Sequence, residues 1–142
     1  MSTILIVEDN TDVATLYERV FSQHQCFMVD SVNPAIAYMK ETIPDLVVLD
    51  FHLKGSFGLD LLVYMRAHPY LMHIPVLGIS SDDFLEDQAR QKGLTAFLRK
   101  PLEMIQLITT SRRLLQAQNT PHSEPDKSNQ KRLDSPIADS RQ

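Results

Sequence analysis

Apolar residues over positions 1–116 follow two alternating patterns. Short continuous runs, rich in β-branched residues, are typical of strands that are buried on both faces. Between them lie segments with apolar residues three and four positions apart, which are typical of amphipathic helices. The expected strands are residues 4–7, 26–29, 46–49, 76–79 and 96–98.

Capping signals indicate where the segments between these strands become helical. Asn10 or Thr11 precedes the first helical segment, and either side chain suits an N-cap. Asn33 followed by Pro34 predicts a cap residue and a first-turn proline for the second helix. The third helix is expected from about 58 to 67, and the fourth begins at Asp82 or Asp83 and ends at Gly93. The last helix is expected to bury one apolar face, formed by Leu102, Ile105, Ile108 and Leu115.

Five strands alternating with five helices predict an α/β fold. The expected architecture is a doubly wound, five-stranded parallel sheet with helices on both faces. Ligands of such sheets bind beyond the carboxyl ends of the strands. The residues that follow each strand are therefore the first candidates for a functional site.

The composition changes near Gln116. Residues 117–142 contain three Pro and four Ser, and their only large apolar side chains are Leu133 and Ile137. Such a segment cannot bury enough apolar surface to offset the entropy lost on ordering. We therefore expect a folded domain over residues 1–116 and a disordered polar tail over 117–142.

Charge and composition exclude several classes of protein. The single Cys excludes a disulfide framework and a Cys-rich zinc site. No apolar run is long enough to span a membrane, and the N-terminus lacks the pattern of a signal peptide. The net charge of −4 disfavours direct nucleic-acid binding, and only four Gly leave no glycine-rich phosphate loop. We expect a soluble cytoplasmic protein without membrane insertion.

Polar residues of complementary types stand at the expected strand ends. Glu8 and Asp9 follow the first strand, Asp50 the third, Ser80 the fourth, and Lys100 the fifth. Carboxylates brought together at one sheet edge repel one another unless a cation or a proton intervenes. Oxygen ligands of this kind suit Mg²⁺, and a carboxylate beside that ion could be a nucleophile toward phosphorus. An ammonium and a hydroxyl group could then hold the phosphoryl oxygens.

Each of these residues also has a simpler explanation. Glu8 and Asp9 could cap the first helix, and Ser80 could be an ordinary turn residue. Lys100 alone would be read as a solvated side chain. Asp50 is harder to explain in this way, since a cap of the third helix would lie closer to Gly58.

Four segments in this order resemble the receiver domain of two-component response regulators. They are ILIVEDN, PDLVVLDFHLKGSFGLDLL, VLGISS and AFLRKP, and the resemblance covers about residues 3–116. It implies a flavodoxin-like fold with strand order 2-1-3-4-5. It also implies that Asp50 accepts a phosphoryl group. The implied ligands of Mg²⁺ or Mn²⁺ are Glu8, Asp9, Asp50 and the backbone carbonyl of His52.

The resemblance further implies a switch. Ser80 and Lys100 would bind the phosphoryl group, and Phe97 would turn inward when Ser80 moves. The Lys100–Pro101 bond would be cis, a form that only X-Pro bonds adopt at low cost. Phosphorylation would thereby change a protein-binding face made of the fourth helix, the fifth strand and the fifth helix.

Some positions depart from the common pattern of this family. Lys54 stands where a proline is usual, and Gly55 follows it, which suggests a more mobile loop with an added positive charge. His52 and Asp82 each lie two residues beyond a site residue. We expect them to flank the path of an attacking water and to tune the lifetime of the acyl phosphate.

The leading hypothesis is a stand-alone response regulator. A histidine kinase or phosphotransfer protein would phosphorylate it, and it would act on a downstream protein, with a homodimer as a further candidate. It would not be an enzyme beyond catalysing its own phosphorylation and dephosphorylation. Two alternatives are a receiver-like scaffold that binds partners without phosphorylation and a receiver fragment that has lost an output domain. An aspartate-based phosphohydrolase is disfavoured, because His52 stands where those enzymes carry a second Asp.

Overall fold

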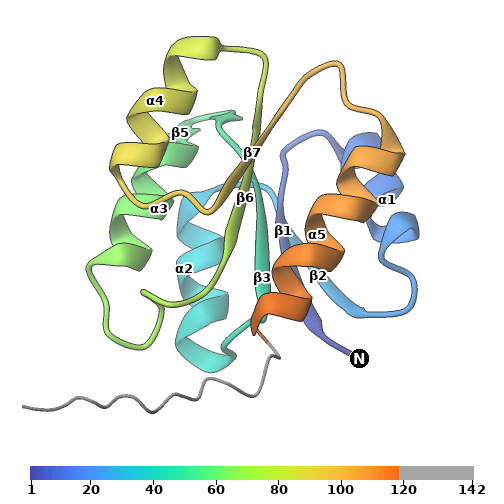
Figure 1. Ribbon diagram of the computed structural model, residues 1–142. Helices are drawn as coiled ribbons and strands as arrows, with labels where there is room; N and C mark the ends of the chain where they lie inside the picture. The colour runs from blue at the N-terminus through green and yellow to red at the C-terminus, as the bar shows by residue number, and fades with distance from the viewer. Residues whose placement is uncertain (119–142) are drawn as a thin grey trace, which may run out of the picture.

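A computed structural model of the chain describes residues 1–118 and has a five-stranded parallel sheet at its centre. The strand order is β2-β1-β3-β6-β7 (Figure 1), which confirms the expected order because β6 and β7 are the fourth and fifth strands of this sheet. A short antiparallel hairpin, β4-β5, connects β3 to α3. The elements are β1 (Thr3–Val7), α1 (Thr11–Val20), β2 (Gln25–Val29), α2 (Val32–Glu41), β3 (Leu46–Asp50), β4 (His52–Leu53), β5 (Ser56–Phe57), α3 (Gly58–Arg66), β6 (Val76–Ser80), α4 (Asp83–Gln91), β7 (Ala96–Arg99) and α5 (Met104–Gln118).

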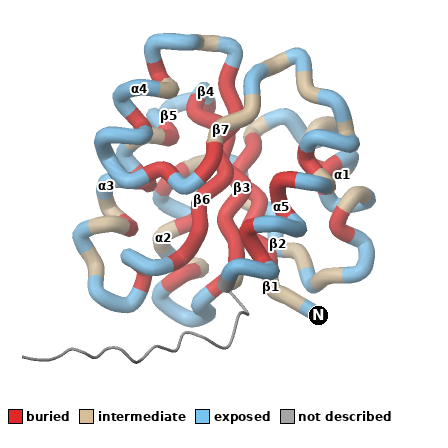
Figure 2. Tube along the Cα trace, viewed as in Figure 1, coloured by how far each residue is buried: buried red, intermediate tan, exposed pale blue. Residues whose placement is uncertain are grey.

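Two apolar cores lie on the two faces of the sheet. Alternate residues of β1 and β3 point to opposite faces, so Leu5 and Val47 pack with α2, α3 and α4, whereas Ile4 packs with α1 and α5. Because helices cover both faces, β3 and β6 are buried along their whole length (Figure 2). The continuous apolar runs of these strands have this cause.

The first capping prediction is confirmed. The second is confirmed for Pro34, which lies in the first turn of α2, and wrong for the cap residue. Asn10 caps α1 by accepting a hydrogen bond from the Val13 N–H at 3.1 Å. Helix α2, however, begins at Val32, and its N-cap is Ser31 rather than Asn33. Ser31 is extended, and Val32, the first residue of the helix, is buried in the same core as α3.

The expected apolar face of the last helix is confirmed at Leu115, which is buried, and wrong at Leu102 and Ile105. Leu102 precedes α5, and Ile105 is 62% exposed. The buried face includes Leu107 and Leu114, with two polar residues, Thr110 and Ser111, between them. The Ser111 hydroxyl can be buried because it donates to the Ile108 carbonyl at 3.1 Å. Because these two buried residues are polar, the hydrophobic pattern of the sequence does not predict this face.

The segment after Asp50 is an ordered hairpin rather than an open loop. His52 pairs with Phe57, and Leu53 pairs with Ser56. Gly55 turns the chain with a φ of 69°, a left-handed conformation that favours glycine. This hairpin holds His52 close to the carboxyl ends of β3 and β6.

Helix α5 extends through Gln118, so two residues that we expected in the polar tail belong to this helix. The rest of the expected tail lies outside the described residues. Among residues 1–118, no helix has both the length and the apolar character needed to cross a membrane.

Candidate functional site

The site is centred on Asp50, the last residue of β3. Its side chain is only 2% exposed, and both carboxylate oxygens have partners. The Lys100 ammonium lies 2.7 Å from Oδ2, and the backbone N–H of His52 donates to Oδ1 at 2.8 Å. Lys100 follows β7, so the ion pair spans two strands that are not neighbours in the sheet. The structure thus brings these two predicted site residues together and balances the buried negative charge.

Glu8 supplies a second buried carboxyl group at the end of β1. Its Oε2 accepts a hydrogen bond from the Asn10 N–H at 3.1 Å, but its buried Oε1 has no hydrogen-bond partner. Burial, together with the neighbouring Asp50 carboxyl, raises the pKa of Glu8 to about 8. An unpartnered acidic oxygen beside Asp50 is a ready acceptor for a cation.

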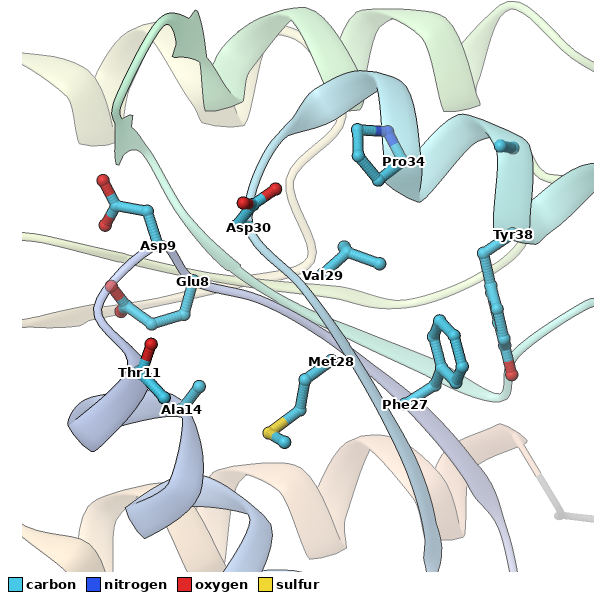
Figure 3. Close-up of a pocket in the computed structure, with 11 residues that line it drawn as sticks. Glu8, Asp9, Thr11, Ala14, Phe27, Met28, Val29, Asp30, Pro34 and Tyr38 are labelled. Carbon is cyan, nitrogen blue, oxygen red and sulfur yellow. The ribbon is translucent and has the colours of Figure 1, made fainter.

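Asp9 is half-buried and lies at the mouth of the same region. Its Oδ2 accepts a hydrogen bond from the Lys54 N–H at 2.8 Å, which ties the β4-β5 hairpin to the end of β1. Figure 3 shows Asp9 and Glu8 lining a pocket together with Thr11 and Asp30. The pocket therefore has an acidic end, and it continues along β2 toward Phe27, an apolar residue.

These residues fit a hard divalent cation. No group of three or more His, Cys, Asp or Glu side chains within residues 1–118 is already arranged as a metal cage. Mg²⁺ does not need such a cage, because it is commonly held by one or two carboxylates and completes its shell with water and phosphate oxygens. The carboxylates of Glu8, Asp9 and Asp50 are donors of the right class, and the unpartnered Oε1 of Glu8 is the clearest indication of a missing partner.

Ser80 ends β6 and is fully buried. Its Oγ accepts a hydrogen bond from the Asp82 N–H at 3.0 Å and lies 3.1 Å from Nε2 of His52. Neither Asp50 nor Lys100 is among its hydrogen-bond partners. The Asp82 carboxylate caps α4 by accepting a hydrogen bond from the Phe84 N–H at 2.9 Å. Asp82 therefore contacts Ser80 through its backbone N–H and not through its carboxylate.

Phe97 packs inward, against a residue that the sequence analysis missed. The ring of Phe51, which directly follows Asp50, is fully buried and lies 6.4 Å from that of Phe97, with an angle of 19° between the ring planes. The ring of Phe51 fits because Gly78 of β6 leaves room beside it. Phe51 therefore joins the end of β3, next to Asp50, to Phe97 of β7, and the signal for it was the glycine at the centre of a buried strand.

The Lys100–Pro101 peptide bond is cis. Beside it, the surface formed by α4, β7 and α5 carries two exposed apolar side chains, Phe84 at 85% and Ile105 at 62%. An ion pair of 2.7 Å between Arg99 and Asp83 joins β7 to α4 across this surface.

Comparison with known proteins gives one consistent family. The family model of the response regulator receiver domain matches residues 4–112. The polar-differentiation response regulator DivK of Brucella ovis is 28% identical over 112 residues, which cover 76% of this chain and 91% of DivK.

Two solved structures show the same fold. The signal receiver domain of a signal transduction histidine kinase from Syntrophus aciditrophicus has a TM-score of 0.79 at 25% identity, covering 89% of this chain and 99% of that one. The receiver domain of a sensor histidine kinase from Pseudomonas aeruginosa, which has a magnesium ion in its active site cleft, has a TM-score of 0.73 at 21% identity and covers 81% of this chain and 98% of its own. At that identity the second likeness concerns the fold alone.

Proposed function

The chain belongs to the response regulator receiver family of two-component signalling, and on that premise we propose that Asp50 is its phosphoryl acceptor. The observation that carries this proposal is the buried Asp50 carboxylate, paired with Lys100 at 2.7 Å beside the unpartnered oxygen of Glu8. The phosphodonor would be a histidine kinase or a phosphotransfer protein, and a downstream protein would read the phosphorylated state.

The contacts of Asp50 suit a nucleophile. The Lys100 ammonium pairs with one carboxylate oxygen, and the His52 N–H donates to the other and so orients the group. One Asp50 oxygen forms the new bond to phosphorus, while the bond from phosphorus to the donor's imidazole nitrogen breaks and the imidazole keeps that electron pair. Lys100 then pairs with the oxygens of the transferred group, whose charge it offsets.

Glu8 and Asp9, at the acidic end of the pocket, would hold Mg²⁺ together with Asp50 and the backbone carbonyl of His52. When bound, Mg²⁺ supplies positive charge that offsets the repulsion between the carboxylates and the incoming phosphoryl oxygens. The buried Glu8 oxygen without a partner supports this assignment.

The output of the switch would be a change in the surface formed by α4, β7 and α5. Ser80 would move to donate its proton to a phosphoryl oxygen, and Phe97 would repack against Phe51 as the β6-α4 connection follows Ser80. The exposed Phe84 on this surface supports contact with a downstream protein. His52 would tune the lifetime of the acyl phosphate, because its exposed ring lies next to Ser80. Asp82 would have a smaller effect on this lifetime, because its carboxylate is engaged in capping α4.

The test is the intact mass of the protein after incubation with acetyl phosphate, with and without Mg²⁺. Wild type is expected to gain one phosphoryl group only with Mg²⁺, and Asp50→Asn is expected to gain none. Asp60→Asn, which changes an exposed carboxylate on α3, is the matched control and should react like wild type. Uptake by Asp50→Asn at the wild-type rate would contradict the proposal. No uptake by folded wild type, from acetyl phosphate or from a phosphorylated phosphotransfer protein, would favour a scaffold that binds partners without phosphorylation.

A further inference from the structure

The contact between His52 and Ser80 crosses the site in a way that the proposed phosphorylation does not use. His52 opens β4, two residues after Asp50, and Ser80 ends β6. The two strands β3 and β6 are neighbours, with Asp50 opposite Ile79, so the His52 ring reaches over the strand end to the next strand. Its Nε2 lies 3.1 Å from Ser80 Oγ, which is hydrogen-bond distance.

The Ser80 hydroxyl already has two hydrogen-bond partners, the Asp82 N–H and the His52 ring. The hydroxyl has one proton, and one of its lone pairs accepts from the Asp82 N–H at 3.0 Å. If Nε2 of His52 accepts, the only proton of Ser80 is committed to His52. If Nε2 donates, Oγ is held between two donors. Both tautomers hold Oγ at His52, and the hydroxyl bonds neither Asp50 nor Lys100.

The two partners differ in what they can do when this bond breaks. Ser80 is fully buried, so its hydroxyl cannot turn to bulk water and needs another partner within the site. His52 is exposed, so its ring can rotate into solvent and stay hydrated. A phosphoryl oxygen on Asp50 would offer the buried hydroxyl that other partner.

The backbone of His52 is held in place by contacts on both strands of the hairpin. The Lys54 N–H donates to Asp9 at 2.8 Å, and the Ser56 hydroxyl accepts from the Val32 N–H at 3.3 Å. The His52 N–H itself donates to Asp50 at 2.8 Å. Release of Ser80 therefore needs only a movement of the Ser80 or His52 side chain and no movement of the hairpin.

We propose that His52 is a positioning residue that holds Ser80 in its unswitched position, and that a phosphoryl group on Asp50 must take the Ser80 hydroxyl from it. This inference rests on the proposed phosphorylation of Asp50. It means that the hydrogen bond between His52 and Ser80 opposes the switched state. A variant without that bond should reach the switched state more readily.

The experiment is a double-mutant cycle with beryllofluoride, a noncovalent mimic of the phosphoryl group, in the presence of Mg²⁺. His52→Phe keeps a ring of similar size but removes the hydrogen bond, and it should lower the half-saturating beryllofluoride concentration roughly two- to tenfold. In the Ser80→Ala background the same change should have no effect. His52→Gln, whose amide can still reach the hydroxyl, should behave more like wild type than His52→Phe does.

A second measurement separates failure of this inference from failure of the proposed function. In the unliganded protein, the ¹⁵N chemical shift of His52 Nε2 should change on Ser80→Ala, and the shifts of the Phe97 ring should move in His52→Phe toward their beryllofluoride-bound values. Wild type that does not bind beryllofluoride would contradict the proposed function. Three results would each overturn the role of His52. Wild type and His52→Phe could bind beryllofluoride with equal affinity, His52→Phe could raise the affinity equally in the Ser80→Ala background, or the ¹⁵N shift of His52 could stay unchanged in Ser80→Ala.

Discussion

Gly78 makes room for the buried ring of Phe51, and adding one methyl group there tests how tightly this part of the core is packed. Gly78 lies at the centre of β6, opposite Leu49 of β3 and Phe97 of β7. A Cβ at this position would lie 2.5 Å from Cε2 and 2.7 Å from Cζ of Phe51, and 3.1 Å from Cδ1 of Leu94. Favourable carbon contacts lie at about 3.5–4.0 Å, so the ring of Phe51 would have to move by about 1 Å.

The surroundings of Phe51 oppose that movement. Its ring is fully buried, and Phe97 packs against it. An added methyl group in a well-packed core costs about 1–3 kcal/mol. Replacing glycine also restricts the unfolded chain, which returns about 0.4–1 kcal/mol. We therefore expect Gly78→Ala to lower the free energy of unfolding by about 1–2 kcal/mol.

Urea denaturation followed by far-ultraviolet circular dichroism measures this change, since the chain has no Trp. Phe51→Leu is the matched background, because the smaller side chain frees the space that the new methyl group needs. In that background, Gly78→Ala should cost at least about 1 kcal/mol less than it does in wild type. A Gly78→Ala protein as stable as wild type, or an equal cost in both backgrounds, would refute the packing argument.

Three further predictions concern stability and the site. Burial and the neighbouring Asp50 raise the pKa of Glu8 from 4.5 to about 8, so this carboxyl's contribution to stability is complete below pH 4.5 and is lost as the pH rises to about 8. In EDTA, Glu8→Gln should therefore gain stability over wild type as the pH rises, by the order of 2 kcal/mol at its largest, and a pH-independent difference would contradict this. The Arg66 guanidinium donates to the carbonyls of Gly93 at 2.9 Å, Met72 at 3.1 Å and Ile74 at 2.9 Å. Arg66→Met should therefore lower the free energy of unfolding, measured by urea denaturation, by about 2–3 kcal/mol. The control Arg90→Met removes an exposed ion pair and should lower it by less than about 0.5 kcal/mol. Equal costs would show that the Arg66 contacts add nothing to stability. A Cβ on Gly58 would lie 2.6 Å from the Asp50 carbonyl oxygen and 2.7 Å from Phe51 Cα. Gly58→Ala should therefore displace the backbone beside Asp50 and slow phosphoryl uptake from acetyl phosphate. Gly55→Asn is the control: no atom lies near the new Cβ, and Asn adopts the left-handed conformation of this residue, so the rate should not change.

The sequence alone determined the class of fold and the residues at the strand ends. The runs at 46–49 and 76–79 are apolar throughout because both faces of β3 and β6 are covered, and this burial is visible in the chain itself. Once five such strands are set parallel, their carboxyl ends share one edge, which is why Asp50 and Lys100 could be expected to meet although fifty positions separate them.

The tertiary structure alone decided how these residues contact their surroundings. Hydrophobic periodicity reports which face of one element is buried, and it misplaced part of the buried face of α5 because two polar residues, Thr110 and Ser111, are buried there. Contacts between elements depend on packing distances of a few ångströms that no local pattern contains. Three features arise only when the strand ends and the hairpin are packed together: the fit of Phe51 against Gly78, the buried Glu8 oxygen without a partner, and the hydrogen bond between His52 and Ser80.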